Sequence, residues 1–264
     1  MSEIVWVIAG LVGWLLLCAG VRWLMDNPRE DLETGLVVRG FALYARLVHR
    51  LRVEGRDRIP TERRPGPLIV LANHTAGVDP ILIQSVCPFE IRWMMAEDMR
   101  TSSLEWFWKY ARIIFVDRLG RRDLLATREA IRHLRGGGVL GIFPEGGLER
   151  PAGQIMPFQK GIGLIVSKTG ASVLPIVIDG TPQVDPAWAS LWRASNSRLR
   201  IGEVIPAGAL GDDPKTYADQ LRERFVSWVG WPKNDSPPSF PESLASESLG
   251  AGETIQTSPD IAPA

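Results

Sequence analysis

The sequence has few of the residues that build disulfide frameworks and metal clusters. It contains two cysteines, Cys18 and Cys87, which excludes a disulfide framework and a CxxC-type zinc site. It has three histidines, and no group of candidate ligands shows metal-ligand spacing, so we expect no metal. Thirty basic and thirty acidic residues cancel, whereas a nucleic-acid-binding chain usually has a basic excess. We therefore expect no nucleic-acid partner.

Apolar residues, by contrast, make up 45% of the 264 residues, which is ample for a core and suits one large domain or two small ones. We predict a membrane anchor at residues 1–26, an α/β domain at 27–231 and a tail at 232–264. The tail has five acidic residues, one basic residue and almost no large apolar side chains. It cannot bury enough surface to offset its ordering entropy, so we expect it to be disordered.

The anchor is predicted from an apolar run near the amino terminus. Ile4 to Val21 comprises 18 residues without a charge or a proline. A helix of this length spans roughly 27 Å, close to the hydrocarbon thickness of a bilayer. A cleaved signal peptide is disfavoured, because the run follows only Met1, Ser2 and Glu3 and no basic segment. We therefore expect a retained, single-pass transmembrane helix in the cell membrane.

Basic residues indicate the orientation of this helix. Arg22, Arg29 and Arg39 follow the apolar run and none precedes it, which favours a cytoplasmic α/β domain. Seven further arginines lie between Arg46 and Arg64, against three acids. They form either an ordinary solvated face or a surface that binds anionic lipid headgroups, worth about 1 kcal/mol per base near the membrane.

Short apolar runs alternate with longer amphipathic stretches between the anchor and the tail, which is typical of an α/β domain. Uninterrupted apolar strands predict a mixed, mostly buried central sheet with helices on both sides. The predicted strands are Leu68–Ala72, Ile91–Met95, Ile113–Val116, Val139–Phe143, Val173–Ile178 and Leu199–Val204. The predicted helices are Leu36–Leu51, Ile81–Val86, Ser103–Tyr110, Asp123–Arg135, Lys160–Lys168 and Lys215–Val229.

Three polar clusters follow predicted strands directly, where ligands of open α/β sheets tend to bind. They run from Asn73 to Pro80, from Phe115 to Arg118 and from Phe143 to Gly147.

The first cluster contains the residues of a general base. His74 suits proton transfer near neutral pH, and a carboxylate is the strongest partner for fixing its tautomer. Asp79 lies five residues on, across a turn that contains Gly77, so the chain can bring the two together. Because no serine or cysteine lies beside the histidine, the pattern favours direct attack by a substrate hydroxyl. Alternatively, Asp79 and Pro80 only begin a helix, as N-cap and first helical residue; the two interpretations are compatible.

The order of these motifs resembles the glycerolipid acyltransferase family, whose best-known bacterial branch is 1-acyl-glycerol-3-phosphate acyltransferase. The resemblance covers roughly residues 67–180. It is carried by Asn73-His74 with Asp79, by Ile114–Arg118, by Phe143–Gly146 and by Val173–Ile176, with Pro157–Gly161 as a further similar stretch.

The resemblance implies an O-acyltransferase that moves a fatty acyl group from acyl-CoA or acyl carrier protein to the free hydroxyl of a lyso-lipid, without a cofactor. His74 would be the general base and Asp79 would orient it. Arg118 would bind the acceptor phosphate; without the resemblance it reads as a surface base. The substrate-binding residues implied in this way are Asn73, Arg118, Glu145, Gly146, Gly147 and Lys160.

One departure from the family pattern concerns the acceptor. The third block commonly reads Glu-Gly-Thr-Arg, whereas this chain has Gly147-Leu148 at its end, so a hydroxyl and a cation are missing. Arg150 is a candidate substitute. The acceptor is 1-acyl-glycerol-3-phosphate or a different lyso-lipid or alcohol. A non-catalytic lipid-binding relative and a hydrolase are the alternatives of other kinds.

The aromatic residues Trp106, Phe107 and Trp108 lie between the first two blocks. They form either part of the core or a membrane-facing patch through which an acyl chain reaches the site.

Overall fold

The computed structural model describes residues 2–117 and 123–236. The helices are α1 (Ser2–Met25), α2 (Leu32–Leu47), α3 (Asp79–Gln84), α4 (Glu105–Tyr110), α5 (Asp123–Arg135), α6 (Gly161–Thr169) and α7 (Tyr217–Val229). The strands are β1 (Arg52–Glu54), β2 (Leu68–Ala72), β3 (Ile91–Ala96), β4 (Ile114–Val116), β5 (Val139–Ile142), β6 (Ser172–Asp179) and β7 (Arg198–Ile201). Short 3₁₀ helices connect them, at Arg56–Arg58, Glu97–Met99, Ser102–Leu104, Ala187–Trp192, Ala207–Leu210 and Pro214–Thr216.

The strands form one sheet in the order β1-β7-β6-β2-β5-β3-β4. Neighbouring strands are parallel except β6 and β7, which are antiparallel, so the predicted mixed sheet is confirmed. In the register, Leu68 of β2 lies opposite Val139 of β5 and Ser172 of β6. The carboxyl end of β2 therefore lies at the middle of the sheet, flanked by other strand ends.

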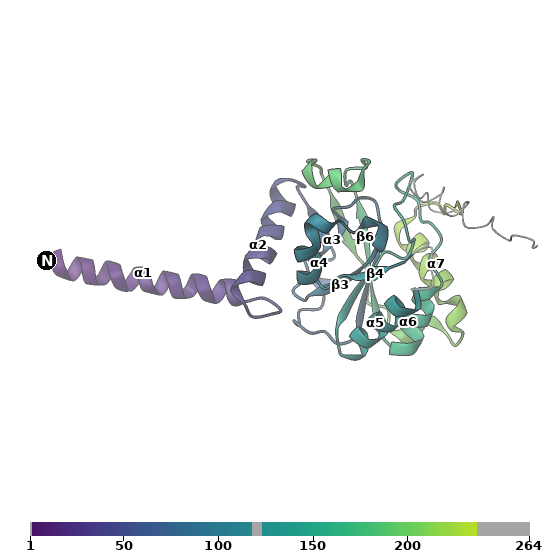
Figure 1. The fold of residues 1–264 in the computed structure, drawn as a ribbon, viewed down its shortest axis with the longest axis horizontal. Helices are drawn as coiled ribbons and strands as arrows, with labels where there is room; N and C mark the ends of the chain where they lie inside the picture. Colours follow the sequence, from purple (N-terminus) through teal and green to yellow (C-terminus); the bar gives the residue numbers. More distant parts are fainter. Residues whose placement is uncertain (1, 118–122, 237–264) are drawn as a thin grey trace, which may run out of the picture.

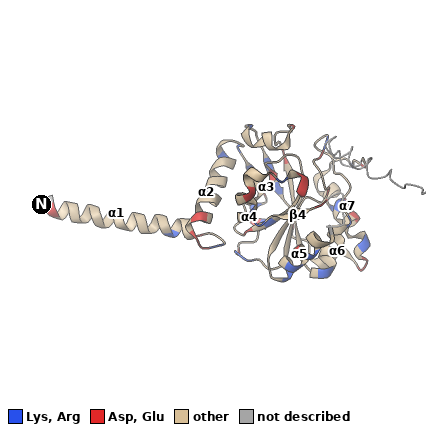
Figure 2. Cartoon of the chain, in the orientation of Figure 1, with Lys and Arg blue, Asp and Glu red and all other residues tan. Residues whose placement is uncertain are grey.

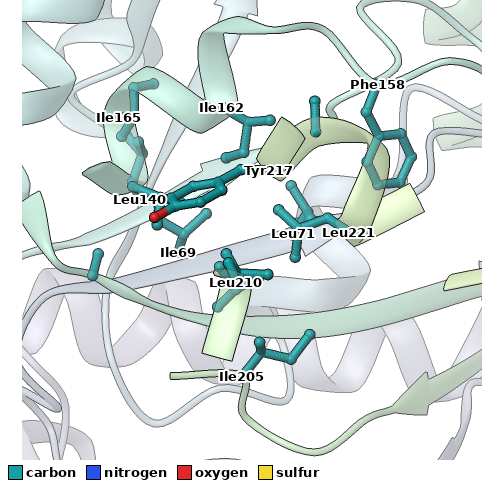
Figure 3. Close-up of a cluster of buried hydrophobic side chains, with 14 of the residues drawn as sticks. Ile69, Leu71, Leu140, Phe158, Ile162, Ile165, Ile205, Leu210, Tyr217 and Leu221 are labelled. Carbon is teal, nitrogen blue, oxygen red and sulfur yellow. The ribbon is translucent and has the colours of Figure 1, made fainter. Parts of the chain in front are cut away.

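Helices cover both faces of the sheet, as predicted. Alternate residues of β2 point to opposite faces, and all five are buried. Ile69 and Leu71 belong to the core under α5, α6 and α7, whereas Val70 belongs to the core under α2 and α3. Figure 1 shows these two groups of helices on either side of the strands. Figure 3 shows Ile69 and Leu71 among the side chains of the first core.

Several predicted boundaries and one strand need correction. The helix predicted from Leu36 begins at Leu32, because the Asp31 side chain accepts from the Thr34 N–H and caps it. The strand predicted to reach Val204 ends at Ile201. The short edge strand β1 was not predicted, because three residues without a buried side chain give no periodic signal.

α1 stands away from the domain (Figure 1), and its charged residues lie near its ends (Figure 2). From Glu3 to Met25 its side chains are exposed, except for the half-buried Leu24. By length and composition it could cross a membrane. Its junction with α2 is closely packed, since a Cβ at Gly35 would lie 2.0 Å from the Leu24 carbonyl oxygen. Arg29, in this junction, donates to both carboxylate oxygens of Glu90 and to the Tyr110 carbonyl. The junction is thereby attached to the α/β domain.

The predicted tail, 232–264, is described only as far as Ser236. Its first residues are held by the domain: the Ile155 N–H donates to the Pro232 carbonyl, and the Asn234 N–H donates to the Ile155 carbonyl. Residues 237–264 lie outside the described part of the chain.

Candidate functional site

The site is built on the turn that joins β2 to α3. His74 lies two residues beyond β2, and Asp79 is the first residue of α3. The His74 Nδ1 lies 3.0 Å from the Asp79 Oδ2, so the contact expected from their spacing is present. The N-cap of α3 is Val78, and the Asp79 side chain turns back toward His74 instead of capping the helix.

The Asp79 carboxylate is completely buried and serves the turn in several ways. Its Oδ2 accepts from the backbone N–H groups of Thr75 at 2.7 Å and Ala76 at 2.8 Å, as well as from the His74 ring. Because three donors point at this one oxygen, the Asp79 side chain acts as a hydrogen-bond acceptor. The His74 Nδ1 is therefore the donor in this contact, and in the neutral ring the lone pair lies on Nε2.

The other edge of the imidazole opens on a cavity. The His74 side chain is 20% exposed, and its Nε2 has no hydrogen-bond partner among the described residues. The cavity has a volume of about 1520 Å³, above the roughly 300–1,000 Å³ of ordinary ligand pockets. Its lining is mainly apolar and includes Val37, Phe41 and Phe107. A long apolar substrate could thus lie beside a basic nitrogen.

The face of the imidazole rests on another ring. The His74 and Phe143 rings are stacked, with centroids 4.0 Å apart and planes 14° apart. Phe143 stacks in turn on Trp93 of β3, at 4.9 Å and 13°. All three rings line the cavity.

Two buried acids lie behind this site. The Glu145 carboxylate accepts from the backbone N–H groups of His74 at 3.2 Å and Met156 at 3.3 Å. The Glu149 carboxylate accepts from the Asn73 side-chain amide at 2.9 Å, and the Glu149 N–H donates to the His74 carbonyl at 2.6 Å. The loop after β5 thus fixes the backbone on both sides of the imidazole.

Burial sets the charge of these acids. Burial, with a further contribution from the nearby Glu149, raises the pKa of Glu145 to about 8. Burial also raises the pKa of Glu149, against the lowering effect of the hydrogen bond from Asn73. Near neutral pH the Glu145 side chain is therefore largely protonated, and it does not place a full negative charge behind His74.

Of the described residues that were predicted to bind substrate, some line the cavity and others do not. Gly146 and Gly147 line the cavity; the φ of Gly146 is 73°, a value that favours glycine at this turn. Asn73 and Glu145 are completely buried and do not line it. Lys160 is exposed at the start of α6 and is absent from the cavity wall.

Cations are scarce in the described part of the cavity wall. Arg118 lies outside the described residues. Among the described residues, the cations that line the cavity are Arg29 and Arg150. Arg29 is paired with Glu90. One guanidinium nitrogen of Arg150 donates hydrogen bonds to the carbonyls of Thr75 and Glu149. No described carboxylate forms an ion pair with Arg150.

Sequence reasoning missed the roles of Glu149 and Trp93. The sequence has no signal that Glu149 folds back onto Asn73, because the two are 76 residues apart. The sequence does contain a signal for the position of Trp93. An isolated glycine, Gly141, interrupts an apolar strand, and such a glycine often marks a place where another group approaches the backbone closely. A Cβ at Gly141 would lie 2.4 Å from the Trp93 ring.

Three comparisons bear on this arrangement. The Acyltransferase family matches residues 50–179, which contain the whole turn and the loop after β5. A 1-acyl-sn-glycerol-3-phosphate acyltransferase of Borreliella burgdorferi is 32% identical over 137 residues, or 50% of this chain and 52% of that protein. The chain thus matches about half the length of this curated relative.

A solved structure extends the likeness to most of the fold. The crystal structure of the 1-acyl-sn-glycerophosphate (LPA) acyltransferase PlsC from Thermotoga maritima superposes with a TM-score of 0.59 and 26% identity. The match covers 76% of this chain and 83% of that one. With the family match, the curated relative and the solved structure in agreement, the chain belongs to the glycerolipid acyltransferase family.

Proposed function

We propose that the chain is an O-acyltransferase that moves a fatty acyl group from a thioester donor, acyl-CoA or acyl carrier protein, to the hydroxyl of a lyso-lipid. The observation that carries this proposal is the His74–Asp79 pair: Asp79 holds the ring at Nδ1, and His74 lines a large, mainly apolar cavity. Membership of the glycerolipid acyltransferase family supports the same chemistry.

In the proposed reaction, His74 Nε2 removes the proton of the acceptor hydroxyl as its oxygen attacks the thioester carbonyl carbon. Asp79 holds the ring and stabilises the resulting imidazolium. The tetrahedral intermediate then collapses, the carbon–sulfur bond breaks, and the imidazolium returns the proton to the leaving thiolate. An oriented base of this kind typically contributes about 10² to 10⁴ in rate.

We propose 1-acyl-glycerol-3-phosphate as the acceptor, with Arg150 as a cation for its phosphate. Leu148 stands where family members commonly carry arginine, and Arg150 supplies a guanidinium in the cavity wall two residues later. Its bond to the carbonyl of Thr75, the neighbour of His74, keeps that charge close to the base. The relative from Borreliella burgdorferi is named a 1-acyl-sn-glycerol-3-phosphate acyltransferase, which supports this acceptor.

We further propose that α1 spans the cell membrane and that the α/β domain lies on its cytoplasmic side. α2 supports this placement, since its leucines at 32, 36, 43 and 47 are exposed and lie along one stripe at helical spacing. An apolar stripe next to a membrane helix suits the interface between headgroups and acyl chains. The cavity lies behind α2, whose Val37 and Phe41 face it, so a lipid acceptor can arrive from the bilayer.

The test presents the full chain in lipid vesicles with radiolabelled acyl-CoA or acyl carrier protein. The acceptors are lysophosphatidate, other lyso-phospholipids and monoacylglycerol. We expect labelled diacylated product, formed fastest with lysophosphatidate. Release of free fatty acid at the same rate with and without acceptor would identify a hydrolase instead. Binding of the lyso-lipid without turnover of either donor would identify a non-catalytic lipid-binding protein.

A further inference from the structure

We propose that Phe143 and Trp93 are positioning residues: they hold the imidazole of His74 by its face and stabilise the imidazolium that forms when the ring takes a proton. The inference rests on the proposed function of His74 as the general base. It adds a second support for the ring beside the hydrogen bond to Asp79.

The first argument is the placement of the three rings across the sheet. His74 follows β2, Phe143 follows β5, and Trp93 lies within β3. These three strands are neighbours in the order β2-β5-β3. The rings therefore form one continuous stack (the ring stack) over three adjacent strands, with His74 at its end.

The second argument is that the backbone makes room for this stack. Trp93 lies opposite Gly141 in the β3–β5 register. A Cβ at Gly141 would approach the Trp93 ring to 2.4 Å, a distance that forces the ring to move. Gly141 thus lets the indole lie over β5, where it stacks on Phe143.

The third argument concerns what the hydrogen bond to Asp79 leaves free. A single in-plane bond at Nδ1 fixes the direction of the ring but permits rotation about that bond. Phe143 removes this freedom, because its ring lies almost parallel to the imidazole at 4.0 Å. The two contacts together determine where Nε2 points.

The fourth argument concerns charge. The reaction converts neutral imidazole into a cation, and a cation within about 6 Å of an aromatic face is stabilised by the ring quadrupole. Among the described residues, four charged or titratable groups lie around His74. Asp79 bonds its ring, Glu145 and Glu149 bond its backbone, and Arg150 bonds the neighbouring Thr75. Phe143 adds a contact that is stronger after proton transfer than before it.

The test measures the pH dependence of kcat/KM for Phe143→Leu, which keeps an apolar side chain and removes the ring face. We expect about a 3- to 30-fold fall on the plateau. We also expect the acidic limb of the profile to move to lower pH by about 0.5 to 1.5 units, because the imidazolium is less stable. Phe143→Tyr restores a ring face and should recover most of both changes.

Two further variants separate positioning from general damage. Trp93→Leu leaves Phe143 in place and should produce smaller changes in the same directions. Phe115→Leu is the matched control: Phe115 belongs to β4, meets Trp108 edge-on, and is absent from the cavity wall. It should leave the acidic limb in place.

A fall in rate without movement of the acidic limb in Phe143→Leu would overturn the proposal, as would equal behaviour of Phe143→Leu and Phe115→Leu. Should Phe143→Leu not fold, the acidic limb of Trp93→Leu decides by the same criterion. His74→Ala keeps the two questions apart. If that variant is inactive while the limb stays fixed in Phe143→Leu, only the ring stack fails; if it is fully active, the proposed function fails with it.

Discussion

The buried carboxyl group of Glu145 should make the protein less stable as the pH rises. Its pKa is raised from 4.5 to about 8 in the folded protein, chiefly by burial. Between these two values the folded chain holds a proton that the unfolded chain releases. The stabilising contribution is therefore complete below about pH 4.5 and is lost as the pH rises through about 8.

The difference of about 3.5 units corresponds to at most about 5 kcal/mol, at about 1.4 kcal/mol per unit. For a domain of this size that is about 10–20 °C in Tm as an upper limit. Glu145→Gln cannot ionise, so its unfolding free energy should depend much less on pH. Glu149, whose pKa is also raised by burial, should retain part of the slope.

The assay is thermal unfolding of the full chain in detergent between pH 5 and pH 8.5, for the parent and for Glu145→Gln. The comparison uses slopes, because glutamine places an amide against one of the two backbone N–H groups and lowers stability at every pH. Glu203→Gln is the control, since the Glu203 side chain is 82% exposed. Equal slopes for the parent and Glu145→Gln would refute the reasoning.

Three further changes test other contacts of the site. Asp79→Asn should lower kcat by about 10² to 10⁴ with little effect on KM, because the amide no longer enforces the tautomer with Nε2 free; steady-state kinetics with an unchanged kcat would contradict this. Asn73→Ala should destabilise the fold by about 1–3 kcal/mol, because Glu149 and the backbone of Ile178 lose their buried partner; an unchanged Tm would contradict the structural role of this amide. Arg150→Gln should raise KM for lysophosphatidate about tenfold while changing KM for monoacylglycerol little, by loss of a charge-assisted hydrogen bond; equal increases for both acceptors would show that Arg150 acts only through the Thr75 carbonyl.

The central strands were predictable from sequence because burial on both faces leaves uninterrupted apolar runs. β2 has the predicted bounds, and α5 does too. The ends of less regular elements depend on tertiary contacts. The helix predicted to reach Leu51 ends at Leu47, because His49 is buried between the hydroxyls of Tyr44 and Ser195.

The sequence predicted the contact between His74 and Asp79 because both lie on one short turn. It could not predict which polar residues of the strand ends turn inward. Asn73 and Glu145 follow strands as substrate-binding residues do, yet Asn73 is buried against Glu149, and Glu145 is buried against the His74 N–H. That burial depends on contacts across more than 70 residues, which no local pattern records.

The support of His74 by Phe143 was not predictable for a related reason. Stacking of two rings that follow different strands depends on the order of the strands in the sheet. The local hydrophobic periodicity of the sequence does not indicate that order. Gly141 was the one local sign of a close approach within its strand.

The most direct test of His74 as the general base is single-turnover acyl transfer to lysophosphatidate in vesicles. The rates of the parent chain, His74→Ala and His133→Gln are compared. His133 is a suitable control because it lies on α5 and its Nε2 contacts the Val139 carbonyl, away from the cavity wall. We predict that His74→Ala loses at least about 10²-fold in rate and that His133→Gln transfers nearly as fast as the parent. Transfer by His74→Ala at the parental rate would contradict the assignment of the general base.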